Sequence, residues 1–341
     1  MLILLSFLIA LHYMKIKTLI LLLALPAILF SGSCNYNTKN INGFTNKIGK
    51  AAMIDKYPRI PGEEILRQEN GTKLFNELES RYRESLFNLQ IETDRYGAKL
   101  VVVILTPDVG KSLSLANSYG VPYITQSCNQ LGIDCLDLST ILSAQDSTAL
   151  IEGPSSGNWT KAGAAFIADQ LSYLLLSYDC YKNTKPFQQT PKPTTFGDLK
   201  PGKDEVLEGE KGVPLHLTTN SQGLRMDHDV TFPKKKQTIL FLGDAELLCP
   251  YLDNHFTSTY LLQQKYPTKE IINAGYMHYT LEDYLSLYLE KARFTEPDIV
   301  VVCTNGEDIL DYFFSARNLY SRAQKVYKPS DNEKQFYGQM N

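Results

Sequence analysis

The sequence lacks a strong excess of charge of either sign. It has 34 Lys and Arg against 37 Asp and Glu, which gives a formal net charge of -3 at pH 7. Nucleic-acid binding normally needs a basic excess on one face, so we expect no nucleic-acid partner. The short basic run from Lys234 to Lys236 is more typical of a solvated strand flank than of a phosphate site.

The sequence is also poor in metal-binding residues. It has 5 His and 6 Cys, and neither a CxxC nor an HExxH spacing occurs, so we expect no metal and no cofactor. Cys128 and Cys135 bracket "NQLGID" and are candidates for a disulfide in an oxidising compartment. Cys303 lies in an apolar run, and we expect it to be a buried free thiol.

The N-terminus has the build of an export signal rather than of folded structure. From Met14 to Cys34 the chain reads "MKIKTLILLLALPAILFSGSC": two Lys, an apolar run, then small residues before Cys. Residues 1–34 are therefore predicted to be a signal of the bacterial lipoprotein type, with Met1 or Met14 as its start and Cys34 as the lipid-modified residue. The polar residues 35–60 are expected to form a tether. The alternative is an uncleaved membrane anchor.

The remaining chain has a globular composition, with 43% hydrophobic and 21% charged residues. Apolar strand-like runs alternate with segments of helical spacing, which predicts an α/β fold with a mostly parallel sheet. The five predicted strands are "KLVVVILTP", "GIDCLDLS", "TILFLGD", "EIINAG" and "DIVVVCTNG". Helices are predicted over 70–97, near 110–119, and over 158–177, 255–266, 280–294 and 307–327.

Residues 215–341 carry three motifs that resemble the beginning of an SGNH (GDSL-type) hydrolase. An "NSQGLR" segment precedes the strand "TILFLGD", where the family has Gly-Asp-Ser at the strand end. The strand "EIINAG" corresponds to the family's Asn-x-Gly, and "EPDIVVVCTNGED" to its "PDxVxxxxGxND".

Residues 61–180 resemble the end of the same family. Two strands precede "SGNWTKAGAAF", where the family has "DxHWNxxGH", and Trp159 and Gly163 match that motif. The end of the family pattern thus comes before its beginning, with residues 181–214 as an irregular linker. The resemblance implies one circularly permuted, flavodoxin-like sheet in the order "EIIN", "ILFLG", "DIVVV", "LVVVIL", "DCLDL". The alternative is two incomplete tandem domains.

The resemblance also implies that the catalytic residues are replaced. The nucleophilic Ser falls on Ala245, its base His on Asn158, and the Asp that orients that His on Ser156. The oxyanion Asn falls on Glu307, and the oxyanion Gly on His278, with Gly275 nearby as the other register. Alanine cannot attack an ester, neutral Asn takes up no proton near pH 7, and Glu would repel an oxyanion. We therefore expect no hydrolysis by the family mechanism.

Four positions remain candidates for a binding cleft: Asp244, Trp159, Gly275 and Asp308. The plainer interpretation is that Asp244 caps the next helix and that Trp159 packs the last helix of the pattern against the sheet. Asn220 and Arg225 of "NSQGLR" are expected to make structural hydrogen bonds.

The sequence thus predicts an exported, lipid-anchored binding or scaffolding protein of the bacterial cell envelope, whose partner is a glycan or an acylated ligand. One alternative is an active esterase or acyltransferase with a site rebuilt from Glu246, Cys249, His278, Glu307 and Asp308. Another is a degraded duplicate that needs a second chain. The oligomeric state stays open.

Overall fold

The computed structural model describes residues 71–106, 115–145, 147–151, 159–185, 192–208, 214–277 and 279–309. All of these residues belong to one compact unit, residues 43–341. The predicted signal, the tether and most of the last predicted helix lie outside the described residues. Among the described helices, none combines the length and the apolar character needed to cross a bilayer.

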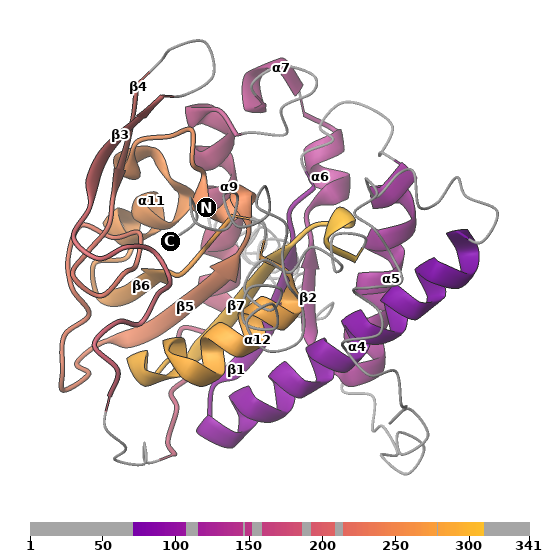
Figure 1. Cartoon of the computed structure of the whole chain (residues 1–341), viewed down its shortest axis with the longest axis horizontal. Helices are drawn as coiled ribbons and strands as arrows, with labels where there is room; N and C mark the ends of the chain where they lie inside the picture. Colours follow the sequence, from indigo (N-terminus) through magenta and orange to yellow (C-terminus); the bar gives the residue numbers. More distant parts are fainter. Residues whose placement is uncertain are drawn as a thin grey trace, which may run out of the picture. The chain divides into compact units, whose positions relative to one another are not determined.

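A five-stranded parallel sheet forms the centre of this unit (Figure 1). Its order is β2-β1-β7-β5-β6, which is the order predicted from the sequence. Strands from both halves of the chain are neighbours, because β1 pairs with β7 from Lys99↔Ile299 to Ile104↔Thr304. The strand bounds are β1 Lys99–Ile104, β2 Asp134–Asp137, β5 Gln237–Gly243, β6 Lys269–Asn273 and β7 Ile299–Thr304.

The central strands β1, β5 and β7 are apolar over most of their length, as is typical of strands whose two faces are both covered. Val102 and Ile104 of β1 belong to one buried cluster, whereas Val101 and Val103 belong to the cluster on the other face. This alternation follows from the two-residue period of a strand.

Helices cover the two faces as separate layers (Figure 1). One layer is α4 Gly71–Tyr96, α5 Leu115–Leu131 and α12 Leu281–Glu290. The other is α6 Ser139–Ser143, α7 Ser147–Leu150, α9 Lys161–Ser177 and α11 Ser258–Lys265. Short turns complete the fold: α10 Ala245–Leu248, η3 Asn254–Phe256, η4 Ala292–Thr295 and η5 Glu307–Ile309.

Two segments differ from the sequence-based expectation. The helix expected near 110–119 continues past Gly120 as α5, which ends at Leu131. Gly120 packs against the backbone of Gly306, because a Cβ at this position would lie 2.0 Å from the Gly306 carbonyl oxygen. Glycine thus lets this helix pack closely instead of ending it. Part of the expected irregular linker forms an antiparallel hairpin, β3 Asp204–Glu208 with β4 Pro214–Thr218. Pro214 stands at the strand start, where a missing N–H is tolerated.

The five cysteines in the described residues are free thiols. Cys303 is buried, as predicted. Cys128 and Cys135 are not joined, although their thiols are in contact. Hydrogen bonding to Cys135, and then burial, raise the pKa of the Cys128 thiol well above its usual range.

Asp298 connects the N-terminal ends of three strands of the sheet. Its carboxylate is almost fully buried and accepts hydrogen bonds from the backbone N–H groups of Asn183 and Thr238, both at 2.7 Å. The ammonium of Lys234 lies 2.7 Å from the same carboxylate, and the carbonyl of Asp298 accepts from the N–H of Lys99 at 2.8 Å. One residue thereby holds the beginnings of β1, β5 and β7 together.

We predict that Asp298→Ala lowers the free energy of unfolding by about 3–5 kcal/mol, because it leaves a lysine and two backbone donors without their acceptor. The matched control is Asp169→Ala, which removes an exposed ion pair with Lys265 and should cost less than about 1 kcal/mol. Urea unfolding of both variants measures the difference. Equal losses would show that Asp298 has no special structural role.

Candidate functional site

The candidate site lies where the parallel strands end, the edge at which open α/β sheets bind ligands. Strand β5 ends at Gly243 and leads through Asp244 into α10, and β7 ends at Thr304 and leads into η5. The motifs "GDAELL" and "TNGED" therefore meet at neighbouring strand ends, as the resemblance implies.

Arg225 fixes the turn that follows β5. Its buried guanidinium donates to the backbone carbonyls of Leu248, Cys249 (2.7 Å) and Leu252, and to the side-chain oxygen of Asn254 at 3.0 Å. Burial lowers the pKa of Arg225 to about 10, so it remains charged at neutral pH. The structural role predicted for Arg225 is confirmed, because these bonds hold α10 against the sheet.

Asn220 organises the turn that carries Arg225. Its side-chain oxygen accepts from the N–H groups of Gln222 and Leu224, at 3.0 and 2.9 Å, and its amide nitrogen donates to the carbonyl of His228 at 2.9 Å. These bonds confirm the structural role predicted for Asn220.

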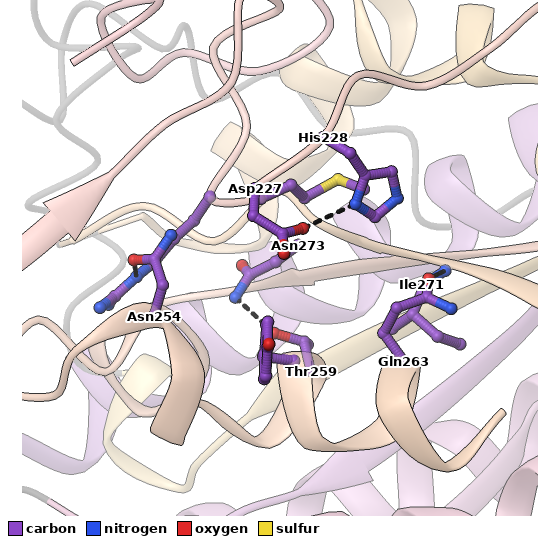
Figure 2. A pocket seen from close by; sticks show the side chains of 10 residues that line it. Asp227, His228, Asn254, Thr259, Gln263, Ile271 and Asn273 are labelled. Atoms are coloured by element: carbon purple, nitrogen blue, oxygen red, sulfur yellow. Dashed lines mark hydrogen bonds and ion pairs between the residues drawn. The ribbon is translucent and has the colours of Figure 1, made fainter. Parts of the chain in front are cut away.

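A small pocket beside this turn is structural rather than a substrate site (Figure 2). Its volume is about 20 Å³, enough for roughly one water molecule. Figure 2 shows Asn273 pointing from β6 toward Thr259 of α11, to whose hydroxyl it donates at 2.9 Å. His228, at the rim, lies 2.7 Å from Asp227 and 3.0 Å from Glu270, and the hydrogen bond to Glu270 is the main reason that its pKa rises to about 9.

Gly275 has its backbone N–H already engaged. That N–H donates to the side-chain oxygen of Asn273 at 2.9 Å. An oxyanion hole needs a donor aimed at the ligand. Gly275 therefore supplies no oxyanion donor in this arrangement. The other candidate for that position, His278, lies outside the described residues.

At Ala245, where the resemblance implies the family nucleophile, the side chain is a methyl group. Ala245 is half-buried and begins α10. Asp244 stands at the N-cap position, but its side chain makes no capping hydrogen bond, so the expected capping role is wrong. Its backbone carbonyl instead accepts from the N–H of Leu248 at 2.8 Å.

Carboxylates gather around this position, and we call Asp244, Glu246, Glu307 and Asp308 the acidic edge. Asn305 joins two of its segments, because its amide nitrogen donates to Glu246 at 2.8 Å while its oxygen accepts from the N–H of Glu307 at 2.7 Å. Asp308 is buried and accepts from the hydroxyl of Thr304 at 2.7 Å, whereas Glu307 is exposed.

The acidic edge changes the protonation of its own members. Burial is the main cause that raises the pKa of Glu246 to about 7, and the negative charge of Glu307 adds to it. Hydrogen bonds from the backbone N–H of Glu246 and from Asn305 act in the opposite direction. The pKa of buried Tyr284 is also raised well above its usual range, first by burial and then by Asp308, Asp244 and Glu246. A further negative charge at the acidic edge is therefore unfavourable.

Cys249 does not have the properties of a nucleophile. Its thiol is buried and donates to the carbonyl of Glu246 at 3.2 Å. Burial raises the pKa of this thiol to about 11, whereas reactive cysteines have lowered values. Among the described residues, no group of three His, Cys, Asp or Glu is placed to hold a metal ion.

Trp159 belongs to the buried core rather than to an open surface. Its side chain is 3% exposed and shares a hydrophobic cluster with Leu247 and Ile167. This burial agrees with the packing role predicted for it. Ser156, Asn158 and Cys34 lie outside the described residues, as does His278.

Sequence reasoning did not single out Asn305, which connects the two segments of the acidic edge. Its only signal was its place directly after an apolar strand that ends in "TNG". Neighbouring parallel strands bring the polar residues at their ends together, so such residues are site candidates as much as the motif positions are.

No protein-family model matches this chain, and no curated protein sequence matches it. Among solved structures, the O-acetyltransferase domain of Pseudomonas putida AlgJ is similar with 13% identity and a TM-score of 0.45, over 74% of this chain and 87% of that one. Pseudomonas aeruginosa AlgX is similar with 16% identity and a TM-score of 0.38, over 69% of this chain and 59% of that one. Similarity at this level transfers no activity. The observed strand order is the one that the sequence resemblance implied.

We predict a pH-dependent stability that originates at Glu246. Its pKa in the folded protein, about 7, exceeds its ordinary value of 4.5, so the folded state favours the protonated carboxyl. Its stabilising contribution is fully present below about pH 4.5 and is lost as the pH rises through 7, a decline on the order of 2–3 kcal/mol. Urea unfolding measured from pH 4.5 to 8 checks this.

The variant Glu246→Gln should lose this decline, because an amide does not titrate. The control is Glu290→Gln, at an exposed position of α12, which should keep the slope of the unchanged protein. Parallel pH profiles for Glu246→Gln and the unchanged protein would contradict the assignment to Glu246.

Proposed function

We propose that this chain is an exported, lipid-anchored protein of the bacterial cell envelope, whose SGNH-hydrolase-like domain binds or scaffolds instead of hydrolysing esters. The observation that carries the proposal is the acidic edge around Ala245. The family reaction needs a hydroxyl at this position and positive or N–H groups around it. This chain offers a methyl group there, with the carboxylates of Asp244 and Glu246 on either side in the sequence and Glu307 close enough to affect Glu246.

The electrostatics oppose the family's transition state more strongly than the missing hydroxyl alone. Attack on an ester places negative charge on the carbonyl oxygen, where donors stabilise it. The resemblance aligns Glu307 with the oxyanion Asn, and the charge of Glu307 adds to the raised pKa of Glu246. An added oxyanion would meet the same repulsion.

The same groups suit a neutral ligand rich in hydroxyls. Carboxylates accept hydrogen bonds from hydroxyl groups, and bonds to charged acceptors contribute about 1.5–3 kcal/mol each. A neutral glycan, or the sugar part of an acylated envelope ligand, is therefore our preferred partner at the acidic edge. The proposed lipid anchor at Cys34 is inferred from the N-terminal sequence. It would keep the domain at a membrane surface.

An active esterase or acyltransferase with a rebuilt site is the alternative. Its strongest nucleophile in the described part of the chain was Cys249, whose burial and raised pKa argue against it. We therefore favour the non-catalytic proposal.

The first test is hydrolysis of a chromogenic acetyl ester by the unchanged chain and by variants that restore the family residues. We expect the unchanged chain to remain at background. Ala245→Ser combined with Asn158→His should gain rate, and adding Glu307→Asn should increase it by a further 10²–10³-fold, approximately the contribution of one oxyanion donor.

The matched control is Ala245→Ser alone, which has a hydroxyl without its base and should stay close to background. Turnover by the unchanged chain that disappears in Cys249→Ala or His278→Ala would overturn the proposal in favour of a rebuilt enzyme.

The second test is binding to a panel of neutral envelope glycans. Saturable binding should weaken about 10-fold or more in Asp244→Asn or Glu307→Gln, because each removes a charged acceptor. Glu290→Gln serves as the control with the same charge change elsewhere. We do not choose Trp159, since its burial makes any substitution a test of folding. Absence of binding across the panel would count against a glycan partner.

A further inference from the structure

A second pocket lies at the opposite end of the strands from the acidic edge. Its volume is about 280 Å³, and five lysines line it together with Glu296 and Asp298. We call it the lysine pocket; its lysines are Lys182, Lys185, Lys234, Lys235 and Lys236. Gln237, also in its wall, is the first residue of β5, whereas the acidic edge follows the last residue of that strand.

The pocket brings together two segments that are distant in sequence. Lys182 and Lys185 follow α9, and the run Lys234 to Lys236 precedes β5. The sequence alone showed only the second segment, which resembles a solvated strand flank. The fold adds positive charge from the first segment and makes the surface concave.

The segment that carries Lys182 and Lys185 is firmly held. The backbone N–H of Asn183 donates to Asp298, and its side-chain amide donates to the carbonyl of Tyr96, both at 2.7 Å. The side-chain oxygen of Asn183 accepts from the N–H of Lys185 at 2.9 Å. A Cβ on Gly97 would lie 2.2 Å from that oxygen, so glycine is needed for this approach. The lysines therefore project from an ordered support.

The two acidic side chains in the wall of the lysine pocket already form ion pairs. Asp298 pairs with Lys234 at 2.7 Å, and Glu296 pairs with Lys192 at 2.7 Å. Lys185 donates to the backbone carbonyl of Asp94. Burial raises the pKa of the Asp94 carboxyl, and the charge of Lys185 partly opposes that rise.

Three lysines of the pocket remain uncompensated. The side chains of Lys182, Lys235 and Lys236 are exposed, and their ammonium groups form no hydrogen bond or ion pair with any described residue. Three like charges around one concavity repel one another, and a bound anion would relieve that repulsion.

We propose that the lysine pocket binds an acidic polysaccharide through the carboxylate groups of its sugar units. Lysine ammoniums act as separate point charges without the fixed fork of arginine, which suits a chain of spaced anionic groups. No aromatic side chain lines the described wall, so base stacking, the usual means of holding single-stranded nucleic acid, has no platform.

The test is binding of a fluorescent oligogalacturonate to the purified full chain. We expect saturable binding that weakens at least about 10-fold in Lys182→Gln/Lys235→Gln/Lys236→Gln, which leaves the Lys234–Asp298 pair intact. Binding should also weaken from about 0.01 to about 0.1 M salt, as the Debye length falls from about 30 to about 10 Å.

The matched control is Lys161→Gln/Lys200→Gln/Lys265→Gln, which removes the same charge from exposed positions outside the pocket and should bind like the unchanged chain. Melting temperatures verify that both triple variants fold. No binding, equal loss in the two triple variants, or binding of polyphosphate or an oligonucleotide as tightly as of oligogalacturonate would overturn the proposal.

Discussion

The pairing of β1 with β7 is the contact on which the rest of the structure depends. It joins the two halves of the chain in register from Lys99↔Ile299 to Ile104↔Thr304. Without it, each half would expose the edge of an apolar strand, a surface prone to aggregation. Loop-closure entropy grows only slowly with length, so the long intervening segment does not prevent this pairing. Everything at either end of the strands is positioned by this central pair.

Much of the fold was predictable from the sequence because buried parallel strands have an unmistakable apolar pattern. The order of the five strands was implied by the family resemblance that the motifs at their ends carry. The hairpin β3–β4 was not predictable, since one of its strands begins with Pro214 within a region rich in proline and glycine. The passage of α5 through Gly120 depends on contact with Gly306, a tertiary effect that local sequence does not contain.

The candidate site was predictable in its location but not in its interactions. Motif positions indicated Ala245 and Glu307, yet the hydrogen bond from Asn305 to Glu246 arises only when two strand ends meet. Likewise, the engaged N–H of Gly275 depends on the rotamer of Asn273. Sequence patterns identify which residues share an edge, whereas the partners of each polar atom are decided by packing and burial.

The separation of charge between the two ends of β5 has a consequence for orientation. Uncompensated lysines lie at one end and carboxylates at the other, so the domain carries a dipole component along its strands. In the field of a negatively charged surface, such a dipole experiences a torque that turns the lysine end inward. The acidic edge would then face away from the surface, toward ligands that arrive from solution.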